Sequence, residues 1–195
     1  MIAALLLAAG RGSRFGGEKL TALLGDRPLV RWSAEALQDA VATTIVVTAP
    51  GAAGIRGALS GVDVRFVEHA GHDKGMGSSI RSGISALPPD VEAVIIALAD
   101  QPLISRDVVV SLCERWRLTR APAVAPQYRD GRGHPVLFDR ACFPALAALK
   151  GDRGARAVLD ALGTAALMLN VDTPMPLDVD TRDALRDVAA LLRPD

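Results

Sequence analysis

The sequence has few cysteines, no excess charge of either sign and no long hydrophobic run. Its two cysteines, Cys113 and Cys142, stand far apart without a C-x-x-C pair, which argues against a disulfide framework or a zinc knuckle. The 22 basic and 22 acidic side chains balance, so no overall field favours nucleic acid or an anionic membrane. The apolar run at 2–9 is far shorter than the roughly 18 residues of a membrane span, and no basic segment precedes it as in a signal peptide. We therefore expect a cytoplasmic protein without nucleic-acid or membrane partners.

The length and composition predict one folded unit. The chain has 195 residues, of which 50% are hydrophobic, and it contains no repeat, low-complexity tract or linker. We therefore expect a single domain over residues 1–195. Lysine is scarce, because only Lys19, Lys74 and Lys150 occur among the 22 basic residues. A lysine in a glycine-rich loop is therefore more informative here than an arginine.

Hydrophobic patterning predicts strands that alternate with helices over the first two thirds of the chain. Apolar stretches typical of buried parallel strands occur at 2–8, 44–48, 64–67 and 91–99. Helices are predicted at 28–38, 52–59, 78–87 and 105–117, the third with Ser78 and Ser79 as candidate caps. Shorter patterns predict strands at 123–125, 135–138 and 166–171 and helices at 140–149, 153–162 and 181–192. This order predicts a three-layer α/β/α fold with a mostly parallel central sheet.

The most informative segment is L-A-A-G-R-G-S-R-F-G-G-E-K at 7–19, directly after the first predicted strand. Its glycines let backbone amides approach a ligand, while Arg11, Arg14 and Lys19 add positive charge. A dinucleotide fingerprint does not fit, because the third glycine comes one residue late and the second strand ends without an acid for a ribose. A P-loop does not fit either, since Glu18 directly precedes the lysine. The segment indicates another type of phosphate-holding loop, with a glycine-rich turn that carries solvated charges as the alternative.

Aspartates follow the strongest predicted strand and precede the last predicted helix. Asp100, in A-L-A-D-Q-P, stands where ligands collect in open α/β sheets, so it could hold a divalent metal on a triphosphate; capping of a turn is an equal alternative. A second acid is offered by L-D-V-D-T-R-D-A-L at 177–185, through Asp178 or Asp180. Either of these could instead cap the helix that follows.

Together, these ordered motifs resemble the molybdenum cofactor cytidylyltransferases, within a wider family that includes the molybdopterin guanylyltransferases. The resemblance rests on the segments at 7–19, G-M-G-S-S-I at 75–80, A-D-Q-P at 99–102, G-H-P-V-L-F at 133–138, G-D-R-G-A-R at 151–156 and D-V-D-T at 178–181. It implies a Rossmann-like fold of the nucleotide-diphospho-sugar transferase type. It also implies transfer of CMP from CTP to the phosphate of molybdopterin, with Mg²⁺ as cofactor, release of pyrophosphate and a molybdoenzyme that receives the product.

The same resemblance implies a role for residues in each motif. Catalysis is expected from Arg14, Lys19 and Asp100, and metal binding from Asp100 and Asp180. Nucleotide binding is expected from Leu7, Ala8, Ala9, Gly10, Arg11, Gly12, Lys19, Gly75, Ser78 and Ser79. The acceptor is expected at Arg132, His134 and Arg156, with His134 either on a phosphate of the pterin or in a surface turn. A second D-T-P at 172–174, and R-D-A at 182–184 where the family usually has P-E-D, leave Asp172 as an alternative to Asp180; we prefer Asp180 because the helix follows it directly.

Further expectations concern single residues and other activities. The related guanylyltransferases carry glycine in place of Ala9, so the Ala9 methyl is expected to narrow the space for a purine and favour CTP. Lys19, as a loop residue, is expected to make few packing contacts. His69 and His72 have the spacing of a metal pair but no further ligands, so they are expected to be solvated. The alternative functions are transfer from GTP or to another phosphate acceptor, and a cofactor-delivery protein or oxidoreductase on the same scaffold.

Overall fold

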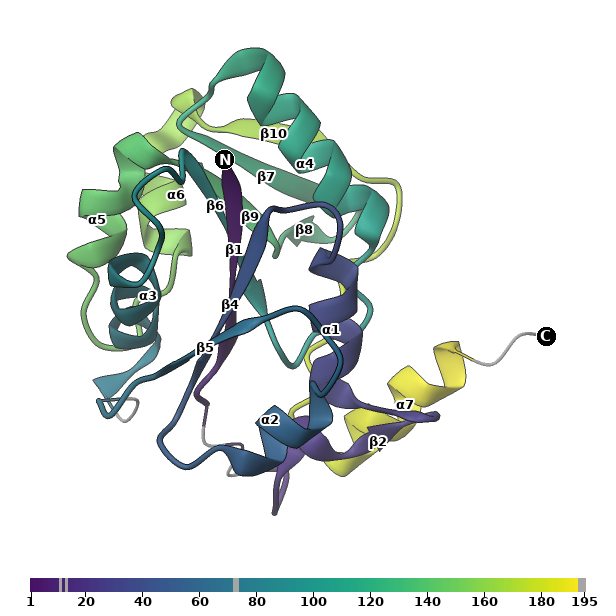
Figure 1. Ribbon diagram of the computed structural model, residues 1–195. Helices are drawn as coiled ribbons and strands as arrows, with labels where there is room; N and C mark the ends of the chain where they lie inside the picture. The colour runs from purple at the N-terminus through teal and green to yellow at the C-terminus, as the bar shows by residue number, and fades with distance from the viewer. Residues whose placement is uncertain (11, 13, 72–73, 193–195) are drawn as a thin grey trace.

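The computed structural model describes residues 1–10, 12, 14–71 and 74–192, and it shows a large sheet between two layers of helices (Figure 1). The 8-stranded sheet has the order β10-β7-β9-β6-β1-β4-β5, with β8 beside β7. Its strands are β1 (Ile2–Ala8), β4 (Thr43–Thr48), β5 (Arg65–Glu68), β6 (Ala93–Leu98), β7 (Ala123–Tyr128), β8 (Gly131–Arg132), β9 (Val136–Asp139) and β10 (Leu167–Asn170). A separate hairpin pairs β2 (Leu23–Leu24) with β3 (Arg27–Pro28).

The strands at the centre of the sheet run parallel. β1 lies between β4 and β6 and pairs in parallel with both, and β4 pairs in parallel with β5. β9 is antiparallel to β6 and β7, whereas β10 is parallel to β7. The predicted α/β fold with a mostly parallel sheet is therefore confirmed.

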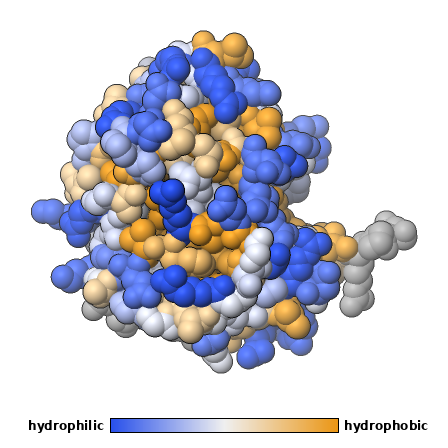
Figure 2. Space-filling view, viewed as in Figure 1, coloured by the Kyte–Doolittle hydropathy of each residue, from blue (hydrophilic) through white to orange (hydrophobic). Residues whose placement is uncertain are grey.

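Helices cover both faces of the sheet (Figure 1). They are α1 (Leu29–Leu37), α2 (Ala53–Ala58), α3 (Met76–Ser85), α4 (Arg106–Thr119), α5 (Phe143–Ala147), α6 (Arg156–Leu162) and α7 (Arg182–Leu191). Because neighbouring strand residues point to opposite faces, β1 contributes Leu6 to the core shared with Val109 of α4, and Leu5 to the core shared with Ile80 of α3. In the view of Figure 1, Figure 2 shows hydrophobic side chains gathered over the region of β4 and β5, with hydrophilic ones around the rim.

The predicted elements occur with shifted ends, and two differences have a clear physical reason. The predicted caps Ser78 and Ser79 are wrong, because α3 begins at Met76 and its N-cap is Gly75, whose φ of 87° favours glycine. The helix predicted at 140–149 is divided into a 3₁₀ turn at Arg140–Cys142 and α5, since Pro144 has no amide hydrogen with which to continue a helix through this point. No helix among the described residues is long and apolar enough to span a membrane.

Candidate functional site

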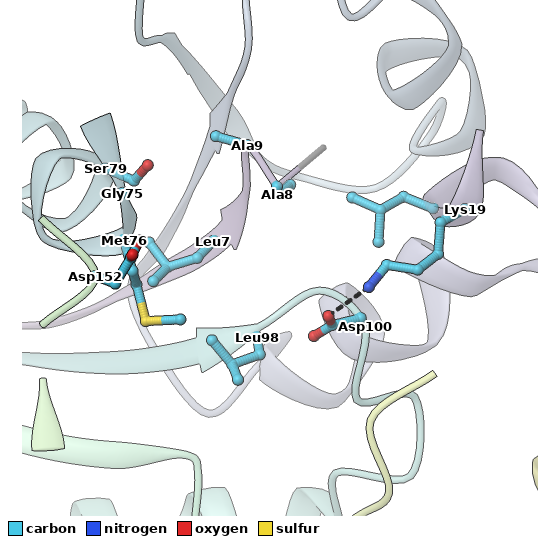
Figure 3. A pocket seen from close by; sticks show the side chains of 12 residues that line it. Leu7, Ala8, Ala9, Lys19, Gly75, Met76, Ser79, Leu98, Asp100 and Asp152 are labelled. Carbon is cyan, nitrogen blue, oxygen red and sulfur yellow. Dashed lines mark hydrogen bonds and ion pairs between the residues drawn. The ribbon is translucent and has the colours of Figure 1, made fainter. Parts of the chain in front are cut away.

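A cavity of about 420 Å³ opens where the parallel strands β1 and β6 end (Figure 3). One wall comes from these strand ends and the loop after β1, and the opposite wall comes from the start of α3 and the loop before α6. It is lined by Leu7, Ala8, Ala9, Gly10, Lys19, Leu20, Gly75, Met76, Ser79, Leu98, Asp100 and Asp152. The volume is that of a small-molecule site. Most of the residues predicted to bind a nucleotide therefore lie around one cavity.

A second cavity of about 230 Å³ adjoins the first. Both are lined by Ala8, Gly10, Lys19 and Leu20, and the second extends between the glycine-rich loop and α2. Gly12, predicted to bind nucleotide, lines this second cavity. Arg11, predicted for the same role, lies outside the described residues. Lys19 therefore lines both cavities.

Lys19 joins two aspartates that are far apart in the sequence. Its Nζ lies 2.7 Å from Asp100 Oδ2 and 3.0 Å from Asp180 Oδ1. Arg14 Nη1 lies 3.8 Å from Asp180 Oδ2, with its side chain 80% exposed. Figure 3 shows the Lys19–Asp100 ion pair at the end of the cavity away from Met76 and Asp152. The structure thus brings together the predicted catalytic residues and both predicted metal ligands.

The electrostatics of Lys19 follow from this contact. Burial alone lowers the pKa of Lys19, but the hydrogen bonds and charges of Asp100 and Asp180 outweigh it and raise the pKa above its usual value. Lys19 is therefore a cation throughout the neutral pH range. The expectation that it makes few packing contacts is wrong: the residue is 9% exposed because the short turn at Lys19–Thr21 turns its side chain inward onto Asp100.

The two candidate aspartates of the late segment lie in different surroundings. Asp172 is 92% exposed and pairs with Arg129, 2.7 Å away, whereas Asp180 contacts Lys19. Asp178 accepts a hydrogen bond of 2.9 Å from Gln101 Nε2. Burial raises the pKa of Asp178, and the negative charge of Asp100 raises it further. Sequence reasoning did not single out Gln101, although its place beside Asp100 in A-D-Q-P was a signal.

The donor set fits a divalent metal that is shared with a phosphate ligand. Asp100 and Asp180 bring two carboxylates to the single ammonium of Lys19. Mg²⁺ and Mn²⁺ prefer such hard oxygen ligands, and Mg²⁺ commonly takes one or two carboxylates together with substrate phosphates. Within the described ranges, no three His, Cys, Asp or Glu side chains are grouped to hold a metal alone. Asp100 and Asp180 therefore suit a metal that also needs oxygens from a ligand.

The serines at the start of α3 have different surroundings. Ser79 lines the large cavity. Ser78 Oγ lies 2.7 Å from Gly75 O and 2.9 Å from His69 Nε2, so its hydroxyl holds the loop before α3. Nucleotide binding by Ser78 therefore stays a prediction. His69, expected to be solvated, instead contacts Ser78, and His72 lies outside the described residues.

Two of the predicted acceptor residues converge on one carboxylate. Arg132 Nη2 lies 2.9 Å from Asp160 Oδ1, and Arg156 Nε lies 3.8 Å from Asp160 Oδ2. His134 is not in a free surface turn, because its Nδ1 lies 3.2 Å from Ile96 O. Burial lowers the pKa of His134, so the ring is neutral at neutral pH and donates its one hydrogen to that carbonyl. A hydrogen bond from this ring to a phosphate therefore requires protonation, and its acceptor role stays a prediction.

The sequence matches the MobA-like NTP transferase domain over residues 4–171. A molybdenum cofactor guanylyltransferase of Cereibacter sphaeroides is 35% identical over 134 residues, 68% of this chain and 65% of that protein. The purine catabolism protein PucB of Bacillus subtilis (strain 168) is 33% identical over 118 residues, 56% of this chain and 53% of PucB. The chain therefore spans about half to two thirds of the length of these curated relatives.

Solved structures resemble nearly the whole chain. Rv0371c of Mycobacterium tuberculosis H37Rv superposes with a TM-score of 0.85 at 29% identity, over 97% of each chain. A complex of Rv0371C with manganese superposes with a TM-score of 0.82 at 28% identity, over 97% of this chain and 98% of that one. CMP:2-keto-3-deoxy-manno-octonic acid synthetase, in complex with CTP, shares the fold at a TM-score of 0.74 and 15% identity, over 98% and 97%. The matched domain shows that the chain belongs to the MobA-like NTP transferase family, and the superpositions show that it shares its fold with these solved structures.

Proposed function

We propose that this chain transfers CMP from CTP to the phosphate of molybdopterin, releases pyrophosphate and supplies the product to a molybdoenzyme. The observation that carries the proposal is the convergence of Lys19, Asp100 and Asp180 beside a cavity with Ala9 in its wall. The guanylyltransferase relatives of Cereibacter sphaeroides and Haloferax mediterranei, 35% and 33% identical, support a molybdopterin acceptor.

The nucleotide would lie along the large cavity. The end near Leu7, Met76 and Leu98 is mostly apolar, with Asp152 beside Met76, and suits a base (Figure 3). The opposite end carries the ammonium of Lys19, which suits a triphosphate. The adjoining smaller cavity gives the glycine-rich loop direct access to the same phosphates. This orientation places the α-phosphorus between the base end and the ion pair.

The proposed reaction needs positioning and charge more than acid–base catalysis. An oxygen of the acceptor's phosphate monoester attacks the α-phosphorus of CTP and forms a new P–O bond. The bond from this phosphorus to the oxygen that bridges to the β-phosphate breaks, and its electron pair leaves with pyrophosphate. The nucleophile is already an anion, so no general base is needed. Lys19 stays protonated because its pKa is raised, and it offers a fixed positive charge to the phosphates; Arg14 adds a second charge from the exposed rim.

We further propose that Asp100 and Asp180 hold a divalent metal, Mg²⁺ in the working enzyme. The manganese complex of Rv0371C, 28% identical to this chain, supports the binding of a divalent ion. When bound, the metal supplies positive charge to phosphate oxygens and helps to orient them.

The choice of CTP rests on Ala9. This residue is 4% exposed and lies in the wall of the cavity, so its methyl group takes space that a purine would use. GTP is the second candidate nucleotide, because a relative of 35% identity is named a molybdenum cofactor guanylyltransferase and one of 33% identity a probable molybdenum cofactor guanylyltransferase.

The test is to incubate the full chain with Mg²⁺, molybdopterin and each of the four NTPs, and to follow pyrophosphate release. We expect release to depend on the acceptor and to be fastest with CTP. The control is Asp100→Asn, which replaces a hard anionic ligand by a neutral side chain of nearly equal volume and should nearly abolish turnover. Release that does not need the acceptor, or an Asp100→Asn variant with a near wild-type rate at saturating Mg²⁺, would contradict the proposal.

A further inference from the structure

Gln101 is a buried amide beside the charged cluster. The residue is 3% exposed, and its Nε2 donates a hydrogen bond of 2.9 Å to Asp178 Oδ1. Its Oε1 is buried and finds no donor among the described residues. A buried amide with an unsatisfied oxygen is unfavourable compared with an apolar side chain of the same size. The side-chain hydrogen bond from Gln101 to Asp178 is therefore the feature that would explain why a glutamine stands here.

That hydrogen bond attaches the segment that carries Asp180 to the end of β6. Between β10 and α7 the chain forms neither helix nor strand. Its first residues are held beside β7, where Val171 N donates to Gln127 O and Thr173 O accepts from Arg129 N. Two contacts hold the segment next to Asp180: Val179 N donates to Asp100 O at 2.9 Å, and Asp178 accepts from Gln101. Val179 is fully buried. The residues on the N-terminal side of Asp180 are therefore held by Asp100 and Gln101.

The chemistry of the contact explains why an amide stands at this position. Asp178 and Asp180 flank Val179, whose amide donates to the backbone oxygen of Asp100, so the three aspartates lie close together. Like charges so arranged repel one another and favour moving the late segment away from β6. An amide opposes this movement, since it donates to a carboxylate without adding a charge that would compete for Asp100 and Asp180.

We propose that Gln101 is a positioning residue that holds Asp178 and, through it, sets Asp180 next to Asp100. The two carboxylates then converge on one cation, the Lys19 ammonium or a divalent metal. The inference rests on the proposed use of Asp100 and Asp180 in nucleotidyl transfer. It adds that Asp180 supports nucleotidyl transfer only while Asp178 is hydrogen-bonded to Gln101.

The test combines a double-mutant cycle with a conservative control. Gln101→Met keeps the length and volume of the side chain but removes the donor, and Asp178→Ala removes the acceptor. Asp178→Asn keeps an oxygen that can accept from Gln101, and it serves as the matched control. For each full-length protein, hydrogen exchange of the Val179 amide is compared with that of the Leu6 amide in β1, and kcat and KM are measured with CTP, Mg²⁺ and molybdopterin.

We expect Gln101→Met and Asp178→Ala each to accelerate Val179 exchange about 10- to 100-fold, the effect of losing one hydrogen bond to a charged group, while Leu6 exchange stays unchanged. Both should lower kcat by a similar factor and change KM for CTP less, because the base end of the cavity is intact. The double variant should be no worse than either single variant, since both remove the same bond. Asp178→Asn should keep Val179 exchange close to wild type.

Unchanged Val179 exchange and kcat in Gln101→Met, or effects that multiply in the double variant, would overturn the inference. Equal acceleration at Val179 and Leu6 would do so too, because it would show a general loss of stability. If the wild-type protein transfers no nucleotide, the proposed function fails, while the exchange measurements still decide whether Gln101 holds the segment.

Discussion

Replacing Lys19 by alanine removes the ammonium that contacts Asp100 and Asp180 at 2.7 and 3.0 Å. The side chains of Lys19, Asp100 and Asp180 are 10%, 26% and 50% exposed. The burial of this cluster is therefore intermediate between that of a buried ion pair and that of a surface ion pair. Breaking a buried pair costs about 3–5 kcal/mol and losing a surface pair about 0–1 kcal/mol. We therefore expect Lys19→Ala to lower the free energy of unfolding by about 1–2 kcal/mol at neutral pH.

For a chain of this length, each kcal/mol lost from the free energy of unfolding lowers the Tm by about 2–4 °C, so the Tm of Lys19→Ala should fall by about 2–8 °C. The sign with pH follows from the raised pKa of Lys19. The stabilisation is fully present below the usual lysine pKa of 10.5 and is lost only as the pH rises through the higher pKa of the folded protein. Neutral pH is therefore the right condition for the comparison.

The same substitution should have the opposite effect on metal binding. A metal ion in the wild-type protein competes with the ammonium for the same two carboxylates, whereas in Lys19→Ala this competitor is absent. A gain of about 1–2 kcal/mol in the free energy of metal binding corresponds to roughly 5- to 30-fold tighter binding of Mn²⁺ in the absence of nucleotide. Turnover with CTP should still fall, because the phosphates lose the charge of Lys19.

Thermal unfolding and titration with Mn²⁺ in the absence of nucleotide measure both effects. The control is Lys150→Ala, which removes an exposed lysine and should change neither the Tm nor the affinity for Mn²⁺. An unchanged Tm together with equal or weaker Mn²⁺ binding in Lys19→Ala would refute the reasoning that one cation occupies the place of the other.

Four other substitutions test particular contacts. Asp180→Asn should reduce kcat by roughly two orders of magnitude. Asp172→Asn changes a side chain that is 92% exposed, and its kcat should stay within about 2-fold of wild type. If steady-state kinetics show the larger loss for Asp172→Asn, the functional aspartate of the late motif is Asp172. Ala9→Gly should raise the GTP-to-CTP ratio of kcat/KM, by about 10- to 200-fold at most, and an unchanged ratio would remove Ala9 from base selection. Gly75→Ala should lower the Tm, because φ is 87° and the new methyl would lie 2.4 Å from the carbonyl carbon of Gly151; an unchanged Tm would show that the loop at Gly151 yields easily.

The central strands and the two ends of the site were predictable from the sequence. The continuous apolar runs that form β1 and β6 indicate strands that are buried on both faces. Because parallel strands end at the same edge of a sheet, the residues that directly follow the two runs are expected at that edge. This geometry agrees with the common site that the family resemblance implied for Lys19 and Asp100. The hairpin of β2 and β3 was not predicted, because strands of two residues leave no period in the pattern.

Contacts between distant segments could not be predicted in the same way. The hydrogen bond between Gln101 and Asp178 joins residues 77 positions apart, so it depends on how two loops pack in the folded chain. The burial of Lys19 was missed for a related reason, since a charged loop residue becomes buried only where tertiary structure supplies partners such as Asp100 and Asp180.

The proposed function is tested most directly by the identity of the product. The full chain is incubated with Mg²⁺, molybdopterin and equal concentrations of CTP and GTP, and the dinucleotide formed is identified by mass spectrometry. The proposal predicts that the cytosine dinucleotide of molybdopterin predominates and that Asp100→Asn forms almost none. A predominance of the guanine dinucleotide, or pyrophosphate release without any dinucleotide of molybdopterin, would contradict it.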